Sequence, residues 1–298
     1  MRKRLTQAAP SAVRKLRMIM ASATPLAVRP APPRWRRWGQ LALSLLLFYL
    51  GLLALLWWKQ EFLLFRPQSL PTAYDFARGP DVHESWVEVP GARLNALHLR
   101  LAQPRGIVFF LHGNGGSLDN WFVNLDFYRS ANFDLFMIDY RVYGKSSGQI
   151  QSQAQLEADV RAAWAAVAQR YAGKRRVIYG RSLGTGLAAS LAAELQPELT
   201  VLVSPYTSMA ALAREVYPWL PAALLRYPLH TDRALAGLAG PLLLIHGTQD
   251  SLVRPDHSQR LQAAFPRAQL LEVPEAGHND SHRFAAYLEG LGAALAQL

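Results

Sequence analysis

The sequence predicts an α/β fold with a mostly parallel, doubly wound sheet, a short cap insertion and one transmembrane helix before the domain. Three observations support this prediction. Apolar, strand-like runs alternate with helical patterns from residue 84 to the end of the chain. Short glycine-rich or polar loops follow these runs, and an uncharged apolar run at 39–58 precedes them all. Continuous apolar strands are typical of sheets that helices cover on both faces.

The predicted sheet begins with a hairpin and continues with buried strands. Residues 84–89 and 93–101 are strand-like and flank Pro90 and Gly91, which favour a turn. The later strands are apolar runs at 106–111, 133–140, 175–180, 198–203, 241–247 and 268–275. Helical spacing is found at 153–171, 187–195 and 282–298. Because a doubly wound sheet gathers functional groups at the carboxyl ends of its strands, we expect the site in the loops that follow these runs.

The basic charge of the chain belongs to its N-terminal segment. The whole sequence has a net charge of +11, from 32 basic and 21 acidic residues. Ten of the basic residues lie within 1–38, and no Asp or Glu occurs before Glu61. The rest of the chain is close to neutral, so a nucleic-acid-binding domain is not expected. The absence of cysteine excludes disulfide bonds, thiolate metal ligands and a cysteine nucleophile.

Residues 39–58 have the length and composition of a membrane span. Twenty helical residues reach about 30 Å, the thickness of a bilayer core. Trp35 and Trp38 lie at one end and Trp57 and Trp58 at the other, where interfacial aromatic residues are expected. The basic side should stay cytoplasmic, which places the later domain on the opposite side of the membrane. A cleaved signal peptide is the alternative, but the bulky sequence "WWKQEF" at the end of the run is a poor cleavage site. An organelle transit peptide is a further, less favoured alternative.

These features divide the chain into four parts. They are a basic cytoplasmic tail (1–38), a transmembrane helix (39–58), a connector (59–81) and an α/β domain (82–298). The connector contains phenylalanine and leucine side chains that could lie against the lipid interface or pack on the domain, and the sequence does not decide between these alternatives.

A serine, an aspartate and a histidine each follow a predicted strand. Ser182 follows the run at 175–180, Asp250 follows 241–247, and His278 follows 268–275. A serine hydroxyl is a weak nucleophile unless a base takes its proton. Histidine can act as that base near neutral pH, and a carboxylate fixes its tautomer and stabilises the imidazolium. The three loops therefore predict a serine nucleophile with its base and acid.

The negative oxygen that such a reaction creates needs hydrogen-bond donors. The N–H of Leu183, at the start of a helix, is a natural donor, and the glycine-rich loop at 113–116 can supply a second. Gly180 and Gly184 flank Ser182 and permit the sharp turn between strand and helix.

These motifs resemble the α/β-hydrolase superfamily. The resemblance covers about residues 82–298 and rests on Gly180-x-Ser182-x-Gly184, on His112-Gly113 after an earlier strand, and on the order Ser, Asp, His. "DYRVYGKSSG" and "HGTQDSLV" also resemble the branch that contains monoglyceride-lipase-like, serine-aminopeptidase-like and membrane-anchored hydrolases. The resemblance implies Ser182 as nucleophile, Asp250 as acid and His278 as base. It implies Leu183 and Asn114, or Gly115 instead of Asn114, as oxyanion donors.

Other residues compete for these roles. Ser146 also lies in a G-x-S-x-G pattern, but it stands well past the end of its strand and no helix follows at once, so Ser182 is favoured. Asp256 competes with Asp250, yet its place after Pro255 is typical of a helix start. His278, Asp280 and His282 could together suggest a metal site, which we do not expect without a defined helix or further ligands.

The expected function is hydrolysis of an ester, thioester or amide, without a cofactor or metal. A membrane anchor and an apolar cap at 206–238 favour a lipid-like acyl ester, and plain core packing is the alternative for that insertion. Arg181, Tyr206, Tyr217 and Trp219 are the candidate pocket residues. No obligate protein partner is inferred. A serine peptidase of the same fold and a catalytically silent, membrane-tethered binding module remain the alternative functions.

Overall fold

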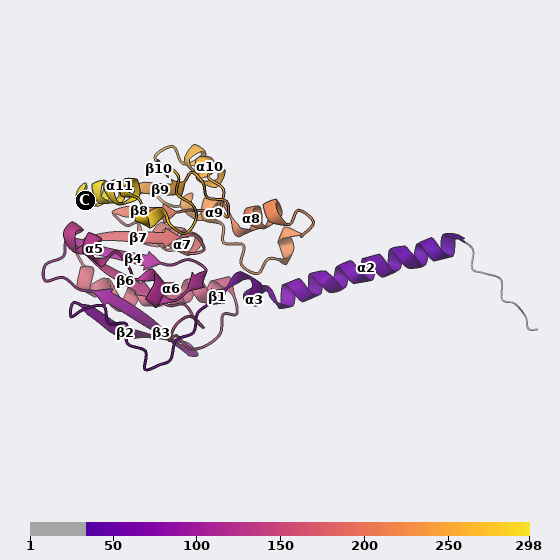
Figure 1. The fold of residues 1–298 in the computed structure, drawn as a ribbon, viewed down its shortest axis with the longest axis horizontal. Coiled ribbons are helices and arrows are strands. Elements are labelled where there is room, and N and C mark those ends of the chain that lie inside the picture. Colours follow the sequence, from indigo (N-terminus) through magenta and orange to yellow (C-terminus); the bar gives the residue numbers. More distant parts are fainter. Residues whose placement is uncertain (1–33) are drawn as a thin grey trace, which may run out of the picture. The chain divides into compact units, whose positions relative to one another are not determined.

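An eight-stranded sheet lies at the centre of the domain, in the order β10-β9-β8-β7-β4-β6-β3-β2 (Figure 1). The computed structural model describes residues 34–298, so most of the predicted basic tail lies outside it. Strand β3 is antiparallel to β2 and β6, and the other neighbours are parallel, which confirms the mostly parallel fold. The strands are β2 (Val82–Val89), β3 (Ala92–Leu99), β4 (Gly106–Leu111), β6 (Phe133–Ile138), β7 (Arg175–Arg181), β8 (Leu199–Val203), β9 (Leu242–Gly247) and β10 (Gln269–Val273).

Helices cover both faces of the sheet, as the continuous apolar strands predict. Along β4, Ile107 and Phe109 belong to one core cluster and Val108 and Phe110 to the other, because successive side chains of a strand point to opposite faces. The first cluster contains the apolar sides of α6 (Gln153–Ala168), α7 (Gly184–Leu195) and α10 (Asp256–Ala264). The second contains those of α4 (Leu118–Trp121), α5 (Leu125–Ala131) and α11 (Ala285–Ala296).

The C-terminal helix is shorter than its sequence pattern predicts. It begins at Ala285 rather than at residue 282, because a 3-10 turn, η3 (Ser281–Arg283), precedes it. A second short 3-10 turn, η1 (Gln169–Tyr171), ends the helical region of α6.

The insertion between β8 and β9 has two differently packed halves. It contains α8 (Met209–Val216), η2 (Ala222–Leu224) and α9 (Thr231–Leu235). Tyr227 and Leu229 are buried in the core that contains α7, so this half matches the core-packing alternative. Val216, Tyr217 and Trp219 remain about half exposed, which leaves an apolar surface on the other half.

The connector is built into the domain. Residues 52–298 form one compact unit, and α3 (Gln60–Leu64) packs against the insertion. Phe65 is 4% exposed and meets the ring of Tyr227 edge-on, whereas Phe62 is 72% exposed. The packing alternative therefore holds for Phe65, whereas Phe62 is left exposed.

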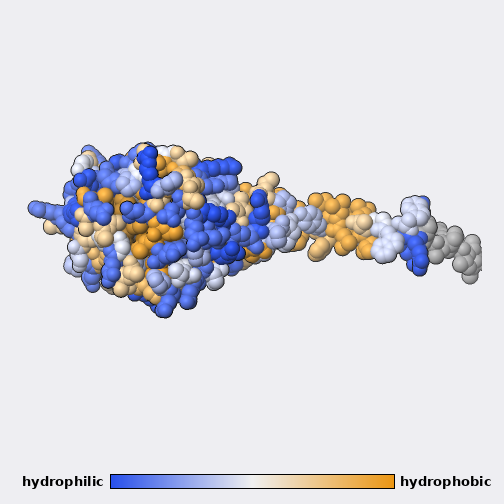
Figure 2. Space-filling view, turned by 90° about the horizontal axis from the view of Figure 1, so that it is seen from above, coloured by the Kyte–Doolittle hydropathy of each residue, from blue (hydrophilic) through white to orange (hydrophobic). Residues whose placement is uncertain are grey.

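Helix α2 (Arg34–Trp58) contains the whole predicted membrane span. It has 25 residues, none of them buried, and Figure 2 shows hydrophobic side chains along its middle. This helix is long and apolar enough to cross a bilayer. An N-terminal signal sequence has a similar length and composition.

Candidate active site

Ser182 stands on a sharp turn between β7 and α7. Its φ is +50°, in the left-handed region that residues other than glycine rarely adopt. A Cβ at Gly184 would lie 2.2 Å from the Leu111 carbonyl oxygen, and one at Gly180 would lie 2.6 Å from the Ala188 Cβ. The two flanking glycines are therefore required for the strand, the turn and the helix to pack this closely.

The structure brings the three predicted reactive side chains together. His278 Nε2 lies 2.8 Å from Ser182 Oγ, and His278 Nδ1 lies 2.8 Å from Asp250 Oδ2. Residues 182, 250 and 278 follow β7, β9 and β10, whose carboxyl ends meet at one edge of the sheet. The imidazole thus bridges the hydroxyl and the carboxylate.

The carboxylate of Asp250 is fixed from several sides. Its Oδ1 accepts hydrogen bonds from the backbone N–H groups of Leu252 (3.0 Å) and Val253 (2.9 Å). Burial alone would raise the pKa of Asp250, but hydrogen bonds from His246 and His278 outweigh burial and hold this pKa well below its usual value. Asp250 therefore stays ionised and can orient the imidazole at neutral pH.

Two backbone N–H groups beside Ser182 are free to bind an oxyanion. Within residues 34–298, the N–H groups of Leu183 and Asn114 donate no hydrogen bond. The Asn114 loop is close to the serine, because a Cβ placed on Gly113 would lie 3.5 Å from Ser182 Cβ. Gly115 is instead paired with the connector through a short parallel ladder.

The short ladder between the connector and the Asn114 loop was not predicted from the sequence. β1 (Arg66–Pro67) pairs with β5 (Gly115–Gly116). The Arg66 N–H donates to Asn114 Oδ1 (2.9 Å), and the Gln68 N–H donates to the Gly116 carbonyl (2.9 Å). The connector therefore holds the loop that carries the second candidate oxyanion donor. No motif could have revealed this contact.

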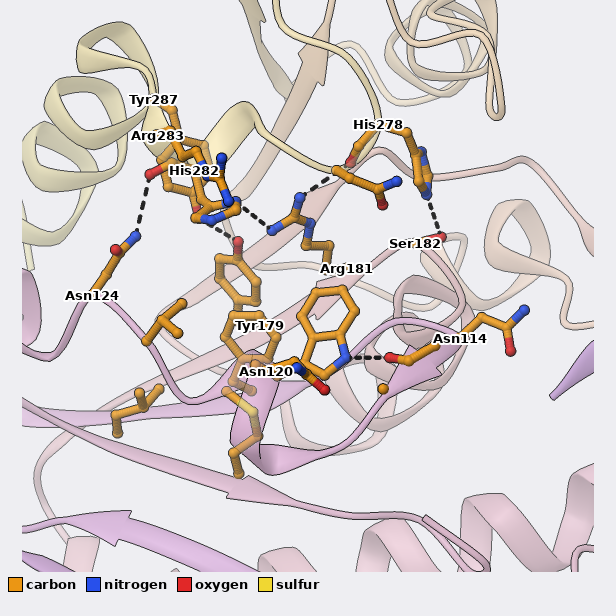
Figure 3. Close-up of a pocket in the computed structure, with 18 of the residues that line it drawn as sticks. Asn114, Asn120, Asn124, Tyr179, Arg181, Ser182, His278, His282, Arg283 and Tyr287 are labelled. Carbon is orange, nitrogen blue, oxygen red and sulfur yellow. Dashed lines mark hydrogen bonds between the residues drawn. The ribbon is translucent and has the colours of Figure 1, made fainter. Parts of the chain in front are cut away.

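A cavity of about 880 Å³ lies beside Ser182, between the sheet and helices α5 and α11 (Figure 3). Its walls combine aromatic rings with cationic and amide side chains. No Asp or Glu lines it within the described part of the chain. Arg181, a predicted pocket residue, lines this cavity, and four aromatic residues that were not predicted line it too: Trp121, Tyr128, Tyr179 and Tyr287.

Arg181 lies at the centre of this cavity. Its guanidinium donates to the His278 carbonyl (3.1 Å) and to His282 Nδ1 (3.0 Å), and it stacks 5.3 Å from the centre of the Trp121 ring. Burial, together with the neighbouring charge of Arg181, lowers the pKa of His282 to about 4. His282 is therefore neutral at pH 7 and accepts the Arg181 hydrogen bond.

The other predicted pocket residues lie elsewhere. Tyr206 is buried, and its hydroxyl donates to the Leu183 carbonyl (2.9 Å), so it supports the turn rather than a pocket. Tyr217 and Trp219 line a second, apolar cavity of about 480 Å³ between α3 and α8. Leu252 and Arg66 line both cavities, so the two adjoin.

The competing residues have structural partners. The hydroxyl of Ser146 donates to the Asp139 carbonyl (2.7 Å) and accepts from the Asn95 N–H (2.8 Å). Asp256 is the first residue of α10, as its sequence context predicts.

The three residues that could suggest a metal site, His278, Asp280 and His282, also have partners within the protein. His278 contacts Asp250 and Ser182, Asp280 Oδ1 accepts from the Gly277 N–H, and His282 faces a guanidinium. These contacts leave the His278, Asp280 and His282 side chains pointing to different partners.

Comparisons with known proteins agree with this fold. A family model described as "Serine aminopeptidase, S33" matches residues 102–234, and one described as "alpha/beta hydrolase fold" matches residues 214–283. The chain is 32% identical over 213 residues to Alpha/beta hydrolase domain-containing protein 17C of Xenopus tropicalis, which covers 69% of this chain and 67% of that protein. It is 31% identical over 211 residues to Alpha/beta hydrolase domain-containing protein 17B of Homo sapiens. That match covers 67% of this chain and 70% of the human protein.

A solved structure shows the same fold at low sequence identity. An esterase of Pyrococcus furiosus is similar with a TM-score of 0.62 and 18% identity, over 78% of this chain and 97% of that one. Together with the relatives above, this similarity places the chain in the α/β-hydrolase superfamily.

Proposed function

We propose that this protein is a serine hydrolase that cleaves an acyl ester, thioester or amide through an acyl-enzyme. The observation that carries the proposal is the hydrogen-bonded row of Ser182, His278 and Asp250, with 2.8 Å between the atoms of each hydrogen-bonded pair. A residue held only for packing has no need of an imidazole on its hydroxyl and a carboxylate behind it.

The proposed reaction has two halves. In the first, His278 Nε2 takes the hydroxyl proton while Ser182 Oγ attacks the substrate carbonyl, and the imidazolium then gives the proton to the leaving group. In the second, a water molecule gives a proton to His278 and attacks the acyl-enzyme, and Ser182 regains its proton when the acid leaves. Asp250 stays ionised throughout and stabilises the imidazolium.

We assign the oxyanion hole to the N–H groups of Leu183 and Asn114. Neither donates a hydrogen bond in the described structure, and both flank Ser182. Preorganised donors of this kind stabilise charge that appears only as the tetrahedral intermediate forms.

The acyl part of the substrate is proposed to be lipid-like. The apolar cavity between α3 and α8 adjoins the Ser182 cavity at Leu252 and Arg66 and can accept a hydrocarbon chain. We also propose that residues 39–58 anchor the protein in a membrane, with the basic tail at 1–38 cytoplasmic and the catalytic domain on the opposite side.

An aminopeptidase is the second candidate, because one matching family model carries that description. An aminopeptidase needs a carboxylate for the positive α-ammonium of its substrate. Among the residues that the structure describes, the Ser182 cavity has no Asp or Glu and includes three arginines, Arg66, Arg181 and Arg283. This charge distribution favours an ester or thioester over an N-terminal peptide.

Burst kinetics test the proposal. The purified full chain is mixed with a p-nitrophenyl ester of medium chain length, and release of p-nitrophenolate is followed from the first turnover. We expect turnover that depends on Ser182 and His278, with a rapid first release if deacylation is the slower half. Hydrolysis of amino-acid p-nitroanilides alone would favour the peptidase, and a folded protein without either activity would favour a binding module.

A further inference from the structure

Two buried arginines at the same edge of the sheet have different surroundings. Arg141, after β6, is 3% exposed, and its Nε and Nη2 lie 2.6 and 2.9 Å from the carboxylate oxygens of Asp159. Arg181, at the end of β7, is 5% exposed, but no Asp or Glu within residues 34–298 forms an ion pair with it. A buried cation without a counter-charge is costly, so Arg181 lacks a partner that Arg141 has.

The guanidinium of Arg181 retains unused donors. Of the five N–H groups of an arginine, one binds the His278 carbonyl and one binds His282. His282 supplies no negative charge, because an imidazole is either neutral or cationic. Figure 3 shows the Arg181 side chain within the cavity, between Ser182 and the Tyr179–Tyr287 pair. Its remaining donors are available to a group bound there.

A second unpartnered polar group lines the same cavity. Tyr128 is 4% exposed, and its hydroxyl makes no hydrogen bond to any residue of the described part of the chain. Burial raises the pKa of Tyr128 well above its ordinary value, against the opposing charge of Arg181, so the phenol stays protonated. A guanidinium and a phenol O–H both donate hydrogen bonds, which the oxygens of a carboxylate or phosphate accept.

The position of His278 indicates which part of the substrate, the acyl chain or the leaving group, lies in the cavity that contains Arg181. The imidazole must reach the leaving group to protonate it. The cavity with Arg181 is lined by the segment that carries His278, including Asn279, His282 and Arg283, whereas the apolar cavity between α3 and α8 contains none of these. The leaving group therefore belongs beside Arg181, and the acyl chain belongs in the apolar cavity.

We propose that the cavity beside Ser182 binds a carboxylate or phosphate carried by the leaving group of the substrate, with Arg181 as its cationic partner. The inference rests on the proposed serine hydrolase activity and names its substrate class, an acyl ester or thioester with an anionic leaving group. A fork of N–H donors on a planar oxoanion gives orientation as well as affinity.

Three esters of one aryl alcohol test this proposal in the purified full chain. They are meta-carboxyphenyl octanoate (charged leaving group), meta-methoxycarbonylphenyl octanoate (neutral) and meta-methoxycarbonylphenyl hydrogen suberate (charged acyl group). We compare kcat/KM for wild type, Arg181→Met and Arg181→Lys. The control is Arg161→Gln, which removes one exposed charge from α6, at a side chain that pairs with Glu194 and lines neither cavity.

The expected result is a change in preference. The ratio of kcat/KM for the first ester over the second should fall about ten- to hundred-fold in Arg181→Met, as for loss of a charged hydrogen bond, and should fall less in Arg181→Lys. Arg161→Gln should keep the wild-type ratio. An equal fall for both esters would reduce Arg181 to a support for His278 and overturn the proposal. A selective fall of kcat/KM for the suberate in Arg181→Met would overturn it too, because the anion would then belong to the acyl group.

A binding measurement separates this inference from the chemistry. Thermal unfolding of Ser182→Ala is followed with meta-hydroxybenzoate or its neutral methyl ester. We expect stabilisation by the anion alone, lost when Arg181→Met is added. No difference between the two compounds would contradict the anion site. Ester turnover that survives Ser182→Ala would instead contradict the proposed function.

Discussion

Ser146 and Ser182 lie in the same five-residue pattern, yet their surroundings differ. Ser182 Oγ faces an imidazole at 2.8 Å, and its backbone is held at a φ of +50° between a strand and a helix. Ser146 Oγ is bonded to two backbone groups, the Asp139 carbonyl and the Asn95 N–H. One hydroxyl meets an imidazole beside a cavity, and the other makes two hydrogen bonds to the backbone within the fold.

The difference shows that the pattern acts through its structural context. The glycines around Ser182 let a helix begin directly after a strand at the sheet edge, where other loops can deliver His278 and Asp250. The glycines around Ser146 serve a turn, and Gly144 and Gly148 both have positive φ. Similar spacing therefore supports two unrelated roles.

Removing the Ser182 hydroxyl should have the largest effect on activity. We expect Ser182→Ala to lower kcat by about 10⁴- to 10⁶-fold, because the acyl-enzyme can no longer form. Initial rates on a p-nitrophenyl ester measure this loss, with circular dichroism as the check on folding. A fall of less than tenfold would remove the distinction between the two serines.

The carboxylate behind the imidazole comes next. Asp250→Asn should keep the shape of the site but favour the wrong His278 tautomer, which lowers kcat by about 10⁴-fold at neutral pH. The measurement is the kcat ratio at pH 7, with Asp256→Asn as a control on the first residue of α10. Near wild-type rates for Asp250→Asn would contradict the assigned orientation.

Acid should change the free energy of unfolding in opposite directions through His282, near Ser182, and through Asp139, near Ser146. His282 has a pKa of about 4 in the folded state, below its ordinary value, so the folded protein binds fewer protons and loses stability as the pH falls from about 6.5 to 4. Burial raises the pKa of Asp139 beside Ser146, despite an opposing hydrogen bond from His112. The folded protein therefore binds more protons at this carboxyl than the unfolded chain does, and the free energy of unfolding rises as the pH falls toward the raised pKa.

Chemical denaturation across this pH range tests the signs. His282→Gln should reduce the acid-induced loss of unfolding free energy between about pH 6.5 and 4, and Asp139→Asn should increase it. The same direction of change in both variants would refute the assignment.

The smallest effect on activity is expected at Ser146. Ser146→Ala removes two buried hydrogen bonds and should lower the unfolding free energy by about 1–3 kcal/mol, while kcat/KM changes less than about threefold. Urea denaturation and ester hydrolysis on the same preparation measure both. Loss of activity without loss of stability would assign Ser146 a chemical role.

The sheet, and the meeting of three side chains at its edge, could be predicted because both depend on local patterns. Apolar runs placed the strands, and parallel strands end at a common edge, so residues 182, 250 and 278 had to approach one another. The pairing of Arg66 with Gly115 could not be predicted, since it joins segments 48 or more residues apart through backbone groups that carry no motif.

The residues that line the Ser182 cavity could not be predicted from the sequence for a related reason. Trp121, Tyr128 and Tyr179 look like core residues in sequence, and only the packing of α4 and α5 on the sheet face that carries Tyr179 places them around one cavity. Tyr206 was the reverse case, an aromatic residue near the site whose hydroxyl is used to bind the Leu183 carbonyl.

Labelling with an alkyl fluorophosphonate shows whether Ser182 is an activated nucleophile, since this probe bonds to a serine that a base has activated. The full chain, Ser182→Ala and Ser146→Ala are treated in parallel, and the modified peptide is located by mass spectrometry. We predict one adduct, on Ser182, in the wild type and in Ser146→Ala, and none in Ser182→Ala. An adduct on Ser146, or folded wild-type protein without any adduct, would contradict the account.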